Sequence, residues 1–275
     1  MTAPLITPHS DALQASVEQL YIVFGRGHVS ERFEVCQCPV CMTEDTRLQI
    51  IKTPSDQLSP DLISEYSNSA HGVPEDLDDL RLMLPRYLDL MARDEMVDDI
   101  GVGTELLRFG QAVRADADVY SPTQWQAINN WAEHMLWHFA HADACQMDNL
   151  YTPMALMDTL LAGGWDVDHI TGVTDAIFQD AQIGQDALAA FLRANQQNLN
   201  IKRAVPKLDW FGTRYASEAT RTGLAQWFNS VALGEVLQML ATDPKADTHD
   251  QTYARILLDA QGSFETASLP KHQYT

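Results

Sequence analysis

The sequence has few basic residues: 18 Lys and Arg stand against 38 Asp and Glu in 275 residues, which gives a formal net charge of −20. Binding to a nucleic-acid duplex requires Lys and Arg to replace the counterions of the phosphates. The densest basic cluster contains only Lys202, Arg203 and Lys207. We therefore expect no direct nucleic-acid binding. The acidic surface is expected to favour solubility or to attract a basic partner.

Long apolar runs are missing as well. No segment approaches the ~20 apolar residues that a membrane-spanning helix needs. The segment Met1–Ser10 is polar and contains Pro4 and Pro8, and it lacks the basic-then-apolar order of a signal peptide. These features predict a cytoplasmic protein that does not bind membranes. In that compartment its four cysteines are expected to be thiols or metal ligands rather than disulfides.

Alternating strand patterns and βαβ units are also lacking, whereas apolar residues recur at three- and four-residue spacing along most of the chain. The pattern predicts an all-α protein. Ser59-Pro60 and Ser121-Pro122 are typical helix starts, and Pro85 should break or kink a helix. Helices are expected over residues 11–24, 44–51, 60–71, 74–84, 123–142, 153–162, 168–180, 184–198, 216–241 and 247–260.

No fixed repeat is legible, because the residues after the two Ser-Pro pairs do not align. An irregular multi-helix bundle and a HEAT-like helical stack both remain open as architectures. The composition, with 45% hydrophobic residues, favours one domain over residues 1–275. Within it we expect a subregion over 35–93 that carries a small cysteine knuckle, and a flexible tail over 262–275.

Three of the four cysteines are clustered near the N-terminus, in the segment Cys-Gln-Cys-Pro-Val-Cys formed by Cys36, Cys38 and Cys41. The two-residue spacer between Cys38 and Cys41 lets both thiolates face one ion, and the proline pre-sets the turn. Cys36 adds a third sulfur. The cluster therefore predicts a structural zinc site.

The fourth zinc ligand is open. His71 is the nearest histidine downstream and is our choice, while His28 and Cys145 are the alternatives. Ordinary reduced thiols, a redox-active cysteine pair and an iron–sulfur cluster are competing interpretations of the same three cysteines.

A second group of side chains that could bind a metal lies on a predicted helix rich in aromatic residues. His134, His138 and His141 are spaced to lie on one face of that helix. Zinc proteases use two histidines one turn apart, but their motif needs a Glu directly after the first His, and Met135 stands there. The simpler interpretation is that these histidines form hydrogen bonds with nearby polar groups. The alternative is that they bind a metal ion. Whether this stripe and the cysteine cluster form one site is left open.

The cysteine cluster, the segment Leu62-Ile63-Ser64-Glu65-Tyr66-Ser67-Asn68-Ser69-Ala70 and the segment Leu84-Pro85-Arg86-Tyr87-Leu88-Asp89-Leu90 together resemble a group of bacterial proteins with an N-terminal Cys-x-Cys-Pro-x-Cys cluster. The resemblance covers about residues 36–91. It implies a small cysteine-bearing helical region in a bacterial cytoplasmic protein, and it carries no assigned activity.

Catalytic motifs are lacking too: there is no Gly-x-Ser-x-Gly nucleophile elbow and no phosphate-binding glycine loop. The sequence therefore favours a non-enzymatic helical protein that binds another protein, with a basic protein as the candidate partner, and that uses zinc as a structural staple. The alternative is a metal-dependent enzyme whose site is built from His134, His138 and His141.

Overall fold

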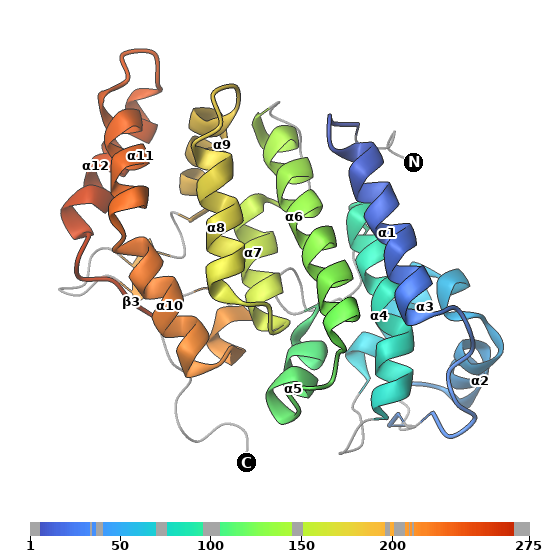
Figure 1. Ribbon diagram of the computed structural model, residues 1–275. Helices are drawn as coiled ribbons and strands as arrows, with labels where there is room; N and C mark the ends of the chain where they lie inside the picture. The colour runs from blue at the N-terminus through green and yellow to red at the C-terminus, as the bar shows by residue number, and fades with distance from the viewer. Residues whose placement is uncertain are drawn as a thin grey trace.

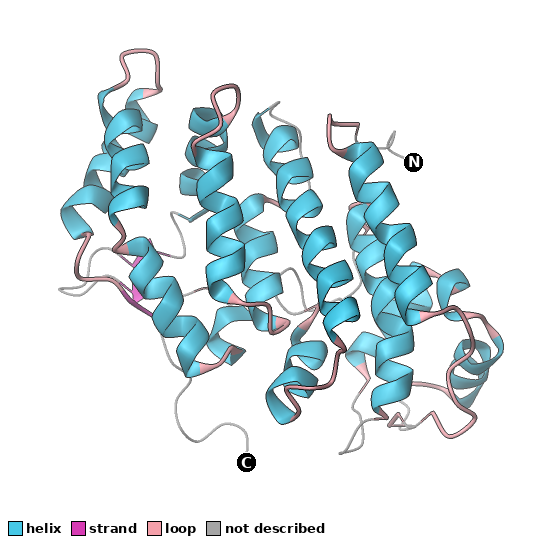
Figure 2. Ribbon diagram, in the orientation of Figure 1, coloured by secondary structure: helices cyan, strands magenta, loops and turns pink. Residues whose placement is uncertain are grey.

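A computed structural model describes the chain over residues 6–33, 35–36, 41–69, 76–95, 105–144, 151–195, 199–200, 207–208, 210 and 212–266. The prediction of an all-α fold is confirmed (Figure 2). The α-helices are α1 (Ser10–Phe24), α2 (Glu44–Lys52), α3 (Pro60–Asn68), α4 (Leu77–Ala92), α5 (Leu107–Ala115), α6 (Pro122–Ala144), α7 (Pro153–Ala162), α8 (Val167–Phe178), α9 (Gly184–Asn195), α10 (Glu218–Phe228), α11 (Val231–Thr242) and α12 (Thr248–Ala260). Two short 3-10 helices are η1 (Ser55–Gln57) and η2 (Gly212–Tyr215).

Most helices begin at a side chain that accepts a hydrogen bond from an otherwise unpaired N–H of the first turn. Ser59 caps α3, which confirms the first Ser-Pro start. The second start is a reciprocal capping box, because Ser121 Oγ accepts the N–H of Gln124 while Gln124 Oε1 accepts the N–H of Ser121. These caps explain why the helix starts were legible in the sequence.

The helices are arranged in two layers (Figure 1). One layer contains α1, α6, α8 and α11, and the other contains α4, α7, α9 and α12, which pack behind them. The longest helix, α6, lies between α1 on one side and α7, α8 and α9 on the other. Buried apolar side chains form one continuous cluster from Leu13 to Phe264. The two layers form one all-α multi-helix fold.

The prediction of one long helix over residues 216–241 is wrong. The segment forms α10 and α11, which are separated at Asn229 and Ser230. Ser230 Oγ accepts the N–H of Leu233 and so starts a new helix. Asn229 holds the break in place, because its Oδ1 accepts the N–H groups of Gly262 and Phe264.

Pro85 does not end a helix, since α4 runs through it without interruption from Leu77 to Ala92. A proline within a helix costs about 3 kcal/mol, because it removes a hydrogen bond and its ring clashes with the preceding turn. All residues of α4 from Met83 to Met91 are buried. Their packing against the rest of the protein offsets that cost.

Small strands close the C-terminal part of the described chain, although the sequence shows no strand pattern. The strand β1 (Leu199–Asn200) pairs antiparallel with β2 (Lys207–Leu208), and β2 pairs parallel with β3 (Glu265–Thr266). Next to β3, the ring of Phe264 is buried and lies 5.2 Å from the ring of Phe228. The first residues of the expected tail over 262–275 are therefore packed on α10, and residues beyond 266 lie outside the described part.

Candidate functional site

The described residues on both sides of the cysteine cluster are anchored to α2 and α3. Val35 and Met42 are buried, and the ring of Phe33 lies 5.1 Å from that of Tyr66 on α3. Cys36 and Cys41 themselves are half-buried, whereas Cys38 lies outside the described residues.

The structure brings the end of α3 to the cysteine cluster. Ser69 Oγ donates a hydrogen bond to the main-chain carbonyl of Cys41 across 3.1 Å. His71 and Cys145 lie outside the described residues. His28 is exposed on the loop after α1.

The histidine stripe is tied to Thr7 before α1, whereas α2 and α3, which adjoin the described neighbours of the cysteine cluster, lie near the other end of α1 (Figure 1). His138 Nδ1 is 2.8 Å from the hydroxyl of Thr7, which precedes α1, whereas Cys36 follows the end of α1. A helix of 15 residues is about 22 Å long. This separation argues against a single site formed by the stripe and Cys36.

His138 is buried and neutral. Its ring is 3% exposed, and burial, followed by the nearby His9 and His141, lowers the pKa of His138 to about 4. Thr7 Oγ1 also accepts the main-chain N–H of His9 at 3.2 Å, which leaves the hydroxyl proton for Nδ1 of His138. This arrangement favours the tautomer of His138 that carries its proton on Nε2.

His9 joins the stripe, although nothing in its sequence context marks it. Its ring stacks on Trp137 with centroids 5.3 Å apart and lies 5.0 Å from the ring of His141. Burial, then His141 and His134, lower the pKa of His9, while Asp180 opposes the shift. Within the described part of the chain, no three His, Cys, Asp or Glu side chains are arranged to hold a metal ion. Thr7 and His9 thus act as a clasp that fastens the N-terminal segment to α6.

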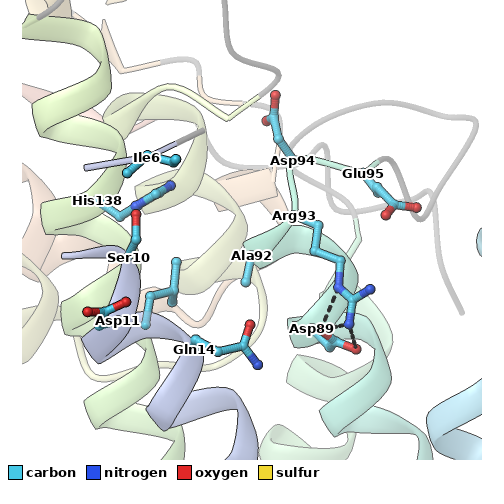
Figure 3. A pocket seen from close by; sticks show the side chains of 11 residues that line it. Ile6, Ser10, Asp11, Gln14, Asp89, Ala92, Arg93, Asp94, Glu95 and His138 are labelled. Carbon is cyan, nitrogen blue, oxygen red and sulfur yellow. Dashed lines mark hydrogen bonds and ion pairs between the residues drawn. The ribbon is translucent and has the colours of Figure 1, made fainter. Parts of the chain in front are cut away.

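A cleft of about 450 Å³ opens beside this clasp, between α1, α4 and α6 (Figure 3). His138, Ser10 and Gln14 line one wall, and Arg93 and Glu95 line the other. The volume suits a small molecule. The polar groups on α4, however, are already engaged with one another.

Asp89 is the centre of that polar network and is 3% exposed. Its carboxylate accepts hydrogen bonds from Arg86 at 2.7 Å, from Arg93 at 2.9 and 3.0 Å, and from the hydroxyl of Tyr21 at 3.1 Å. Burial and the Asp89 charge raise the pKa of Tyr21. Since Asp89 is fully engaged and His138 is held by Thr7, the network stabilises the cleft and does not resemble a nucleophile–base pair.

Acidification should weaken the clasp between His138 and Thr7. The pKa of His138 is lowered in the folded protein, so folding favours the neutral ring. The resulting stabilisation is complete above the ordinary pKa of 6.5 and is lost as the pH falls towards about 4. NMR titration of the histidine rings should therefore find one ring that titrates near 4.

A variant supplies the control for this pH effect. His138→Gln should lose part of the stability difference between pH 6.5 and pH 4, whereas His28→Gln, at an exposed position, should keep it. If every ring titrates near 6.5, the described burial of His138 is contradicted.

None of the helices in the described ranges is both long and apolar enough to cross a membrane. No protein-family model, curated protein or solved structure matches the chain. Its function therefore has to be inferred from its own residues.

Proposed function

We propose that this chain is a helical protein that binds a basic protein partner through its acidic surface. We also propose that Cys36, Cys38, Cys41 and His71 hold a structural zinc ion. The first proposal is supported mainly by where the charged side chains point.

Most of the described arginines contact other groups of the same protein. Arg26, Arg47, Arg93 and Arg193 pair with the protein's own carboxylates. Others donate to main-chain carbonyls that helices and loops leave unpaired: Arg81, Arg86, Arg108, Arg114, Arg221 and Arg255. These contacts use the cations to hold the fold together.

Most of the described acidic side chains, in contrast, are exposed, although Asp79, Asp89, Glu105, Asp158 and Asp250 are buried. Exposed carboxylates are found on α1, α2, α3, α6, α8, α9, α10, α11 and α12, and in the loops between them. With a formal net charge of −20, such a surface creates a negative potential of several kT that attracts a basic partner and speeds its association. Nucleic acid is repelled by the same field.

The experiment for partner binding is recovery of partners by the full chain from a native lysate at low and high salt. We expect a partner with a basic surface that is recovered at low salt and lost at about 1 M salt, where the screening length falls to about 3 Å. Recovered partners that are acidic, or binding that is unchanged by salt, would contradict the proposal.

The zinc site has its own test. Elemental analysis and native mass spectrometry of protein purified without added metal should find about one zinc per chain. Cys38→Ser and His71→Ala should each remove the metal and lower the melting temperature, whereas Cys145→Ser should leave both unchanged. Metal-free protein with all four thiols titratable would rule the site out.

A further inference from the structure

A groove of about 710 Å³ lies where α6, α8 and α10 begin. Trp125 and Asn129 on α6 form one side, Trp165, Asp166 and Asp168 follow at the start of α8, and Glu218 lies at the start of α10. We infer that this groove binds an arginine side chain, with its flanking backbone, from the basic partner. The inference rests on the proposed function and names the surface that would carry it.

The charge of the groove is of one sign. Asp166, Asp168 and Glu218 are all exposed, and no Lys, Arg or His is found among the described residues that line the groove. One oxygen of Asp166 caps α8 by accepting the N–H of His169 at 2.9 Å. The carboxylates of Asp168 and Glu218 have no hydrogen-bond or ion-pair partner in the portion of the chain described. Their charges are therefore available to a ligand.

The aromatic wall provides a second, independent feature. Trp125 is half-buried and is held edge-to-face by Trp165, with centroids 6.3 Å apart, and by Tyr120, with centroids 5.2 Å apart. Trp165 is 3% exposed, and its buried indole N–H finds no acceptor among the described residues. A buried donor without an acceptor is costly. Trp165 lines the groove, but this N–H is itself covered, so a main-chain carbonyl of an occupant supplies the acceptor only if the groove opens as the occupant binds.

The chemistry of the groove selects a guanidinium group. A tryptophan fixed beside carboxylates favours a cation that can stack on the ring and donate hydrogen bonds at its edge. Arginine does both with one planar group, whereas the ammonium of lysine is compact and strongly hydrated. Phosphates are repelled by three carboxylates. The carboxylates are not gathered as a metal site would require, since no such group occurs in the described ranges.

The probe is a short peptide of arginine and glycine, and its control is the same peptide with citrulline in place of arginine, which keeps the planar shape and removes the charge. Binding to the full chain is measured by fluorescence anisotropy at low salt. We expect the arginine peptide to bind at least tenfold more tightly than the citrulline peptide.

Matched variants distinguish binding in the groove from attraction by the net negative charge of the protein. Asp168→Asn with Glu218→Gln should weaken peptide binding about tenfold, and Trp125→Leu about fivefold. The control pair Asp61→Asn with Glu235→Gln removes the same charge from exposed positions of α3 and α11. That pair should change affinity less than about twofold.

Two outcomes would overturn the inference. Equal losses in the groove pair and the control pair would show that binding depends on net charge alone. Failure of the unmodified chain to bind the arginine peptide would also overturn it. In either case, a basic partner recovered from the lysate in a salt-dependent manner would leave the proposed function standing. Circular dichroism of each variant checks that the helices are retained.

Discussion

Replacing Asp158 by alanine should lower the free energy of unfolding by about 3–5 kcal/mol. Asp158 lies on α7 and is 5% exposed. Its carboxylate accepts the main-chain N–H of Gly212 at 2.8 Å and the N–H and hydroxyl of Thr213, both at 2.6 Å. Alanine would leave these buried donors without acceptors, each at a cost of about 1–3 kcal/mol. Chemical denaturation measures the loss.

Asp175 provides the matched control for this prediction. Its half-buried carboxylate accepts one hydrogen bond, from Trp227 Nε1 at 2.8 Å. Asp175→Ala should therefore cost only about 1 kcal/mol. If the loss in Asp158→Ala is no larger than the loss in Asp175→Ala, the described network around η2 does not stabilise the fold as its geometry implies.

Protonation of Asp158 should make the free energy of unfolding depend on pH. Burial raises the pKa of Asp158 from 3.8 to about 6, although the hydrogen bonds from Gly212 and Thr213 oppose the shift. Folding therefore favours the protonated form. The contribution of this group to the free energy of unfolding decreases as the pH rises from 3.8 to about 6 and is level outside that window. Asp158→Asn should lack this slope.

The helices were predictable where local chemistry decides them, and they were missed where distant contacts decide. Ser59 and Ser121 cap helices with their own neighbours, so their helix starts could be seen in the sequence. The break at Ser230 has a local cap, since Ser230 accepts the N–H of Leu233, but the apolar spacing continues across it, and Asn229 also holds it through residues more than thirty positions away. The path of α4 through Pro85 depends on burial by the rest of the core. The short helix α5 carried no start signal, since Leu106 precedes it without a side-chain cap.

The candidate sites follow the same rule. The spacing of the cysteines and of the stripe on α6 is local and legible. Thr7 and His138, in contrast, are 131 positions apart, and Asp158 and Gly212 are 54 apart. No periodicity or motif reports such a pair in a single sequence. The hydrogen-bonding roles of His138 and Asp158 therefore became clear only when the helices were placed.

Asp89→Ala should also lower the free energy of unfolding by about 3–5 kcal/mol, for an electrostatic reason. The side chains of Arg86 and Asp89 are only 11% and 4% exposed, and their ion pair is 2.7 Å long. Without the carboxylate, the Arg86 guanidinium stays buried beside neutral partners, the Leu58 carbonyl and the Tyr21 hydroxyl. Removing one partner of a buried ion pair leaves a charge that neither water nor the protein compensates. Urea denaturation of the variant measures the effect.

Three further variants distinguish this mechanism from simple loss of packing. Asp78→Ala breaks the exposed pair with Arg81 and should change stability by less than about 1 kcal/mol. Arg93→Ala removes the partner of Asp89 that is 53% exposed, and it should cost less than Asp89→Ala because Arg86 still neutralises the carboxylate. The double change Arg86→Met with Asp89→Leu should recover most of the stability, since no charge then remains buried. A double variant as unstable as Asp89→Ala would show that the hydrogen bonds to Leu58 and Tyr21, rather than charge compensation, hold α4 in place.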